Sequence, residues 1–231
     1  IVRRSVNLSK QIQIIAANVD LLFLVITIHH PETTLGFVDR FLAGAEAYRI
    51  PTVLVYNKID VYKTEKQLEE LKRWQVIYES AGYQQLEVSA ESKLGIRALK
   101  EKMIQKTSIF SGHSGVGKST LVNALDENFK LKTSGISDYH KTGRHTTTFA
   151  ELFELPFGGK IIDTPGIKGF GTVDLDNEVL SHYFPEMRSR MEDCKFNNCV
   201  HINEPKCAIK EAVENGEIAF ERYENYLSIY N

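Results

Sequence analysis

The sequence has few of the features that would assign it to a special class. Its three cysteines are an odd number and all lie between positions 194 and 207, which argues against a disulfide framework and predicts a reducing, cytoplasmic location. Neither sign of charge dominates, because the formal net charge is −2. Composition alone therefore shows no basic nucleic-acid-binding footprint. We find no internal repeat and no low-complexity segment.

Long hydrophobic runs and a secretory signal are also lacking. The apolar run from Leu21 to Ile28 is far too short to span a membrane, so we expect no membrane association. No apolar segment follows the opening residues 1–4, as it would in a secretory signal. The chain lacks an initiator methionine and starts abruptly, as if a segment upstream were missing. Its 42% hydrophobic and 25% charged residues are ordinary for a globular protein.

Strands alternate with helices over the first half of the chain. Continuous apolar runs predict buried strands, and apolar positions spaced for one helix face predict amphipathic helices. The expected strands are 21–28, 52–56 and 85–88, and the expected helices are 32–48, 64–81 and 96–104. This alternation predicts an α/β fold with a mostly parallel sheet and helices on both faces.

A phosphate-binding loop follows this region. It matches the P-loop pattern G-x-x-x-x-G-K-S/T, with a strand-forming run at 107–111 before it and a helical run at 120–125 after it. Its glycines allow successive backbone N–H groups to turn onto phosphate oxygens, and the helix adds its positive N-terminal end. Lys118 would reach the β- and γ-phosphates, and the Ser119 hydroxyl would ligate Mg²⁺. The predicted nucleotide-binding residues of this loop are Gly112, His113, Ser114, Gly115, Val116, Gly117, Lys118, Ser119 and Thr120.

Two further motifs predict that the bound base is guanine. The sequence after the second strand is N-K-x-D, in which Asp60 can accept both the ring N–H and the exocyclic amine of guanine. The stem of Lys58 would cover the face of the base, and Asn57 would brace the loop. After the third strand, the pair Ser89 and Ala90 matches the loop whose backbone N–H meets guanine O6. Together with the P-loop, these motifs predict binding of GTP and GDP.

A D-x-x-G motif, Asp163 to Gly166, follows a short predicted strand at 160–162. We expect Asp163 to hold Mg²⁺ through water and the Gly166 N–H to meet the γ-phosphate. The polar stretch 143–148 precedes a predicted strand at 149–155 and supplies the threonine that closes over Mg²⁺. The spacing does not decide whether Thr146 or Thr147 is the threonine that closes over Mg²⁺, and we favour Thr147.

The order of these motifs indicates a circular permutation. In an ordinary small GTPase the P-loop comes first and N-K-x-D comes late, whereas here N-K-x-D and Ser-Ala precede the P-loop. The sheet can stay the same, but the D-x-x-G segment then runs directly into whatever follows residue 170. We therefore predict a permuted GTPase domain over 1–170 and a second domain over 171–231, which carries a net charge of −6.

The second domain contains a pattern typical of a metal site. Cys194, Cys199, His201 and Cys207 can form a closed tetrahedral Cys₃His zinc site, which would be structural because no ligand position is open. We expect helices over 176–183 and 208–214 around it. A last helix, over 217–230, carries an aromatic-rich face that is better explained by packing than by base stacking.

Taken together, the permuted order, GHSGVGKST, GRHTTT, DTPGIKGF and the C-x4-C-x-H-x5-C ending resemble the bacterial ribosome small-subunit-dependent GTPase A (RsgA) family. The resemblance covers nearly the whole chain. It implies a cytoplasmic GTP hydrolase that acts as a checkpoint and release factor late in small-subunit maturation and is stimulated by the ribosomal particle. The family also carries an N-terminal RNA-binding OB-fold domain, and this chain begins about where that domain should end. We therefore expect a weakened rRNA contact, and a monomer.

The residue that positions the attacking water is not obvious. In Ras-like enzymes a glutamine after D-x-x-G does this, but here the position is Ile167, which has no hydrogen-bonding group. The nearest candidate is His145, and the resemblance supports its catalytic role; an RNA-facing or merely exposed imidazole is the alternative. Two other functions stay open: a GTP-gated binding module with negligible turnover, and a permuted GTPase of large-subunit assembly.

Overall fold

The computed structural model describes residues 2–6, 9–126, 151–163 and 175–231. The predictions made for His145, Thr147 and Gly166, and the predicted domain boundary after residue 170, lie outside these residues. For residues 2–16, Glu151 and Asp163 the backbone is described but not the side chain.

The centre of the fold is a six-stranded sheet with the strand order β5-β4-β3-β6-β8-β7. Every neighbouring pair is parallel except β7 and β8, which are antiparallel. This confirms the predicted mostly parallel sheet. The strands are β3 (Leu21–Ile26), β4 (Thr52–Tyr56), β5 (Gln84–Glu87), β6 (Thr107–Ser111), β7 (Glu151–Glu154) and β8 (Lys160–Asp163).

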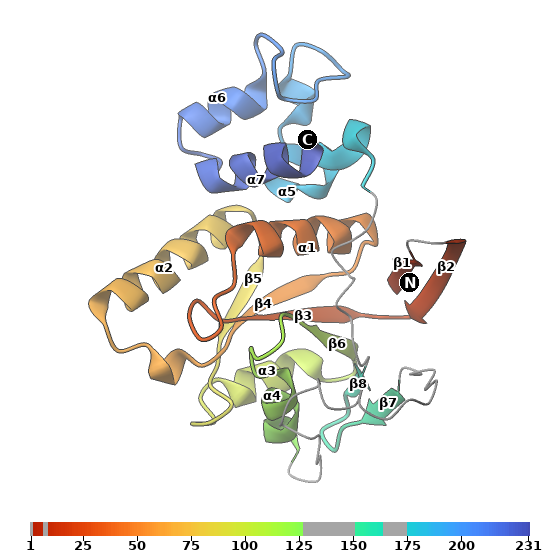
Figure 1. The fold of residues 1–231 in the computed structure, drawn as a ribbon, viewed down its shortest axis with the longest axis vertical. Helices are drawn as coiled ribbons and strands as arrows, with labels where there is room; N and C mark the ends of the chain where they lie inside the picture. Colours follow the sequence, from red (N-terminus) through yellow and green to blue (C-terminus); the bar gives the residue numbers. More distant parts are fainter. Residues whose placement is uncertain (1, 7–8, 127–150, 164–174) are drawn as a thin grey trace.

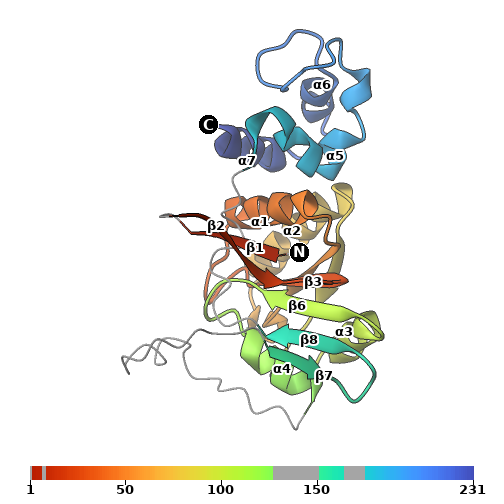
Figure 2. The same ribbon diagram turned by 90° about the vertical axis from the view of Figure 1, so that its right-hand side faces the viewer.

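Helices cover both faces of this sheet, as predicted (Figures 1 and 2). On one face lie α1 (Leu35–Ala47) and α2 (Glu65–Ser80), and on the other lie α3 (Ile96–Met103) and α4 (Lys118–Leu125). A short 3₁₀ turn, η1 (Ile59–Val61), follows β4. The alternating residues of β3 show how one strand serves both layers: Leu22, Leu24 and Ile26 pack with α1 and α2, whereas Leu21, Phe23 and Val25 pack with α3 and α4.

Local signals in the sequence explain where the helices begin. The Thr34 hydroxyl accepts a hydrogen bond from the Phe37 N–H and caps α1. A complete capping box of Thr64 and Gln67 starts α2. Strand β3 ends two residues earlier than predicted, because the Thr27 N–H turns to the Thr33 hydroxyl instead of a neighbouring strand. The remaining predicted elements of this region differ from the structure by at most three residues at either end, the largest difference being the start of α1 at Leu35 instead of 32.

The C-terminal region is helical and has its own core. Its elements are η3 (Asn177–Tyr183), α5 (Pro185–Arg188), η4 (Met191–Asp193), α6 (Ala208–Glu214) and α7 (Phe220–Tyr230). The predicted helix over 176–183 is a 3₁₀ helix, and it ends because Phe184, which precedes a proline, adopts extended backbone. The last helix begins at Phe220 rather than at 217. We refer to residues 175–231 as the C-terminal module.

This module packs on α1, so that α1 lies between α7 and the sheet (Figures 1 and 2). Ala43 of α1 belongs to the same buried cluster as Leu180, Phe184 and Tyr226 of the module. A separate antiparallel hairpin of β1 (Val2–Val6) and β2 (Ser9–Ala16) was not predicted. None of the helices in the described residues is both long and apolar enough to cross a bilayer.

Candidate nucleotide and metal sites

The predicted nucleotide-binding loops meet at one edge of the sheet. N-K-x-D follows β4, Ser-Ala follows β5 and the P-loop follows β6, and these three strands are parallel. Their carboxyl ends therefore share an edge. The chain order also reverses here, because β4 and β5 lie on one side of β3 and β6 lies on the other. Open α/β sheets bind ligands at such a reversal.

Asn57 joins all three loops. Its side chain is buried, with 1% exposed. Its Nδ2 donates to the Val116 carbonyl of the P-loop at 2.8 Å, and its Oδ1 accepts from the Ala90 N–H at 3.3 Å. Loops separated by dozens of residues in the sequence are thus held in one arrangement. The loop of Ser89 and Ala90 was predicted to offer a backbone N–H to guanine O6. In this arrangement the Ala90 N–H donates to Asn57 and the Ser89 N–H donates to the Leu94 carbonyl.

Lys58 forms a second link between loops. It adopts the left-handed backbone region at φ 62°, and its ammonium donates to the His30 carbonyl at 2.7 Å and the Gly115 carbonyl at 2.8 Å. His30 lies in the loop between β3 and α1, so this loop is attached to the P-loop as well. Asp60, two residues on, is half-buried, and within the described residues its carboxylate has no hydrogen bond or ion pair. It is available to a base held over Lys58.

The glycines of the P-loop are required by its geometry. Gly112, Gly115 and Gly117 all have positive φ. A Cβ on Gly112 would clash with the Val25 carbonyl, and one on Gly117 would clash with Asn57 Nδ2. No hydrogen bond among the described residues uses the backbone N–H groups of residues 115–119 as donors. These N–H groups at the start of α4 can therefore serve phosphate oxygens.

Lys118 brings a partly buried charge to the same loop. Its ammonium donates to the carbonyls of Gly112 at 2.8 Å and His113 at 2.6 Å. Burial lowers the pKa of Lys118 to about 8. Burial, and then the nearby Lys118 charge, also lower the pKa of His113. Without a ligand, the loop therefore disfavours the protonated forms of Lys118 and His113, and a bound phosphate anion would favour them.

The residues predicted to hold Mg²⁺ are only partly described. Ser119 lies in the first turn of α4, and Asp163 is the last residue of β8, the strand beside β6. The backbone thus brings both to the edge that carries the P-loop. A hydroxyl and a carboxylate fit the oxygen preference of Mg²⁺. As ligands, Ser119, Asp163 and Thr147 stay predictions.

The four predicted metal ligands lie together in the C-terminal module. The ligand atoms of Cys194, Cys199, His201 and Cys207 are all within 4.8 Å of one another, and all four residues are buried. Nδ1 of His201 is 3.6 Å from Sγ of Cys194 and 3.4 Å from Sγ of Cys207. Ligands about 2.0–2.3 Å from a tetrahedral ion lie roughly 3.5–3.8 Å apart, so the cluster fits a zinc-sized ion. Burial raises the pKa of the Cys199 thiol to about 12, and a bound cation would favour its thiolate form.

Groups that the sequence analysis did not identify support this cluster. Glu204 accepts the backbone N–H groups of Val200, Ile202 and Asn203 at 2.9–3.1 Å. Although burial alone would raise the pKa of Glu204, these N–H donors outweigh it and lower the pKa. The carboxylate thus fixes the loop around His201. Two tyrosines of α7 also hold this loop, because the hydroxyls of Tyr223 and Tyr226 donate to the carbonyls of His201 and Val200, both at 2.6 Å.

The aromatic-rich face of the last helix packs inward, as predicted. Tyr226 is fully buried, and Tyr223, Leu227 and Tyr230 pack against the same cluster. Phe220 is the exception, with 59% of its surface exposed.

A buried ionic network that the sequence did not predict joins the module to α1. Arg222, 1% exposed, donates to Asp39 at 2.7 Å and to both carboxylate oxygens of Glu186 at 2.7 and 3.0 Å. Burial opposes the charge on Arg222, but the two carboxylates outweigh it and raise its pKa. Asp39 also accepts hydrogen bonds from Tyr78 and Asn225.

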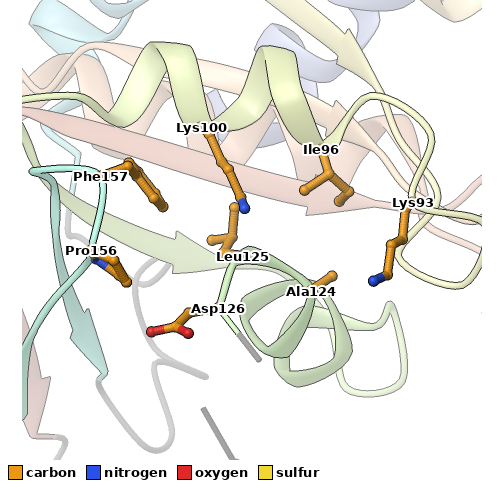
Figure 3. Close-up of a pocket in the computed structure, with 8 residues that line it drawn as sticks. All are labelled: Lys93, Ile96, Lys100, Ala124, Leu125, Asp126, Pro156 and Phe157. Atoms are coloured by element: carbon orange, nitrogen blue, oxygen red, sulfur yellow. The ribbon is translucent and has the colours of Figure 1, made fainter. Parts of the chain in front are cut away.

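A separate cavity of about 550 Å³ lies at the end of α4 that is remote from the P-loop (Figure 3). Lys100 points into it from α3, and Phe157 of the β7–β8 turn lines it beside Lys100. The Lys100 ammonium is 5.6 Å from the centroid of the Phe157 ring. None of the predicted nucleotide-binding residues lines this cavity.

Comparisons with known proteins agree with this arrangement. The family model of the RsgA GTPase matches residues 1–173. The chain is 56% identical over 229 residues to the small ribosomal subunit biogenesis GTPase RsgA of Christiangramia forsetii, covering 99% of this chain and 72% of the relative. Among solved structures, YjeQ from Thermotoga maritima is 42% identical with a TM-score of 0.81, over 92% of this chain and 70% of that one. YloQ, described as a circularly permuted GTPase, is 27% identical with a TM-score of 0.76, over 99% and 77% of the two chains.

Proposed function

The chain belongs to the RsgA GTPase family, and from that premise we propose that it hydrolyses GTP during maturation of the small ribosomal subunit. It is a GTP-hydrolysing enzyme with a circularly permuted fold. The relatives' name, small ribosomal subunit biogenesis GTPase, supports the cellular role. Because that role is exercised where ribosomal subunits are assembled, we place the protein in the bacterial cytoplasm.

The observation that carries the proposed site is the joining of three loops by Asn57 and Lys58. Asp60 would accept the two guanine donors, and the N–H groups of the P-loop would bind the phosphates. Lys118 would move from its carbonyl partners to the β- and γ-phosphate oxygens, where its charge offsets theirs. Mg²⁺, when bound, would neutralise charge that develops on the phosphates; Ser119 and Asp163, with Thr147, would hold it.

Hydrolysis in this proposal depends on residues outside the described part of the chain. His145 would orient the attacking water, since Ile167 has no group that can do so. The γ-phosphate would meet the Gly166 N–H. We propose that turnover by the isolated chain is slow and that the small ribosomal subunit stimulates it, so that hydrolysis becomes the release step.

For the metal cluster we propose zinc, bound once per chain in a structural role. Three thiolates and an imidazole are the donor set that zinc prefers, and no fifth protein ligand or open position is needed. Zinc would supply folding free energy to a module whose buried core includes the ligands themselves.

The test is GTP turnover by the purified chain, measured alone, with small subunits and with large subunits. We expect stimulation by small subunits only. Sedimentation through a sucrose gradient should show co-migration with the small subunit in the presence of a non-hydrolysable GTP analogue and release with GDP. Binding without stimulated turnover would instead indicate a GTP-gated binding module. Co-migration with large subunits would overturn the proposed partner.

A further inference from the structure

The P-loop is in direct contact with α1 through two aromatic rings. The imidazole of His113, the second residue of the loop, lies over the Phe37 ring with their centroids 3.6 Å apart and an angle of 31° between the planes. Phe37 is in the first turn of α1 and also packs against Phe41. A ring stacked this closely limits where the first turn of the P-loop can lie.

The loop that precedes α1 is attached to the P-loop as well. The Lys58 ammonium donates to the carbonyls of both His30 and Gly115. Internal hydrogen bonds hold this preceding loop: the Thr27 hydroxyl donates to the Pro31 carbonyl at 2.5 Å, and the Thr33 N–H donates to the Thr27 carbonyl at 3.0 Å. The N-terminal end of α1 therefore cannot shift without moving groups that contact the P-loop.

Another face of α1 is attached to the C-terminal module. Asp39 follows Phe37 by two residues, which places it about 200° further around the helix. Its carboxylate, 1% exposed, binds Arg222 at 2.7 Å and Asn225 at 2.5 Å, both on α7. A buried carboxylate with several charge-assisted or polar donors has one well-defined position. The orientation of α1 is therefore set by α7.

We propose that Phe37 and Asp39 are positioning residues that couple the P-loop to the C-terminal module through α1. Phe37 acts on the nucleotide through His113, and Asp39 acts through Arg222 and Asn225. Binding of a guanine nucleotide restricts α7, and by linkage a partner that holds α7 changes nucleotide affinity. This inference rests on the proposed binding of GTP at the P-loop.

Hydrogen–deuterium exchange of the full chain, with and without a saturating non-hydrolysable GTP analogue and Mg²⁺, tests this coupling. We expect the nucleotide to slow amide exchange in two regions, residues 118–125 of α4 and residues 220–230 of α7. In Phe37→Leu at saturating nucleotide, the slowing of amide exchange at residues 118–125 should persist. The slowing at residues 220–230 of α7 should become smaller by about fivefold or more, which is the lower end of the range for coupled sites. Asn225→Ala should likewise reduce the slowing of amide exchange in α7.

Two control variants separate coupling from general loosening. Phe37→Tyr keeps the aromatic ring and should keep the α7 effect. Arg73→Gln removes an exposed ion pair, 3.1 Å long, between α2 and Glu221 of α7 and should also keep it, because that pair does not involve α1. A variant that only loosens the fold would speed exchange equally with and without nucleotide.

The outcomes are distinct. No α7 effect in the unchanged chain, or an equal effect in Phe37→Leu, would overturn the coupling while leaving GTP binding intact. If the nucleotide does not slow amide exchange at residues 118–125 in the unchanged chain, the proposed GTP binding is overturned, and the coupling with it.

Discussion

Asn57 and Lys58 show how much of the nucleotide site depends on single side chains. Each contacts a loop far away in the sequence, and each does so from the edge where β4 ends. Asp60 stands apart from this network and is free among the described residues to contact a ligand. The base choice proposed for Asp60 and the loop architecture therefore depend on different residues of the same four-residue motif, and they can be tested separately.

Asp60→Asn tests base choice. The amide cannot accept both guanine N–H groups, so GDP affinity should fall by a factor of about 10²–10⁴, since each unpaired polar group costs about 1–3 kcal/mol. Affinity for xanthosine diphosphate should rise, because its 2-oxo group can accept from the new amide. Titration with fluorescent analogues of both nucleotides measures this. Glu91→Gln, an exposed carboxylate of the Ser-Ala loop, should change neither affinity; unchanged GDP binding in Asp60→Asn would contradict the assignment.

The pKa of Lys118 predicts a pH dependence of nucleotide affinity. Burial lowers this pKa to about 8, and a bound phosphate would raise it because it favours the charged form. Below pH 8 the ammonium is protonated in both states. Above pH 8 binding must take up a proton, so affinity for GDP should fall as the pH rises, by at most about tenfold per pH unit.

Isothermal titration calorimetry at pH 8.5, in two buffers of different ionisation enthalpy, measures this proton uptake. The uptake should be much smaller at pH 7. Lys118→Arg should bind GDP more weakly but without the added uptake at pH 8.5, because a guanidinium stays charged. Equal uptake at both pH values in the unchanged chain would refute the role of Lys118.

At the scale of elements, periodicity and short motifs predicted most of the sheet and its helices. The strand at 107–111 and the helix at 208–214 were predicted with the bounds that the structure shows. The hairpin of β1 and β2 was not predicted, because two arginines interrupt the short apolar pattern of residues 2–6. The helix predicted over 176–183 is a 3₁₀ helix, and the short α5 that follows it was not predicted although Pro185 was its local signal.

The contacts between elements could not be predicted in the same way. Nothing near Arg222 in the sequence marks it as buried, and its carboxylate partners lie 36 and 183 positions away. The stacking of Phe37 on His113 depends equally on the packing of α1 beside the P-loop. By contrast, the clustering of the four predicted metal ligands was predictable, because four donors within fourteen residues constrain one another locally.

Cys199→Ser tests the metal cluster as an element of the fold. Loss of one ligand should release the metal and loosen the C-terminal module, because the ligands form part of its buried core. Metal analysis should find about one zinc per chain in the unchanged protein and far less in the variant. Asn198→Ser, at the exposed neighbouring position, should retain zinc. Guanine nucleotide binding should largely survive in both variants, and a metal content near zero in the unchanged chain would exclude the site.

At the scale of the whole molecule, the permutation changes what the D-x-x-G segment leads to. In this chain order, β8 and its Asp163 are followed directly by the segment that enters the C-terminal module, and the module returns to pack on α1. Under the proposed function, a ribosomal particle that holds the module would be linked to the D-x-x-G motif by the chain order alone.

His145→Ala should keep nucleotide affinity but reduce turnover stimulated by the small subunit by about a hundredfold or more, the usual effect of losing a group that positions or activates water. Steady-state phosphate release with saturating small subunits measures this. Ile167→Ala is the matched control, because its side chain has no hydrogen-bonding group, and it should change turnover much less. Full stimulated activity in His145→Ala would remove this histidine from the mechanism.

The ion pair between Asp39 and Arg222 also bears on how the newly made chain folds. The two residues are 183 positions apart, and at about 5–20 residues per second a ribosome translates the second roughly 10–40 s after the first. During this interval α1 has emerged, but the helix that covers Asp39 and Ala43 has not. The nascent domain therefore presents a surface that the finished protein buries, and a chaperone has time to bind it. Docking of α7 is then the step that ends this exposure.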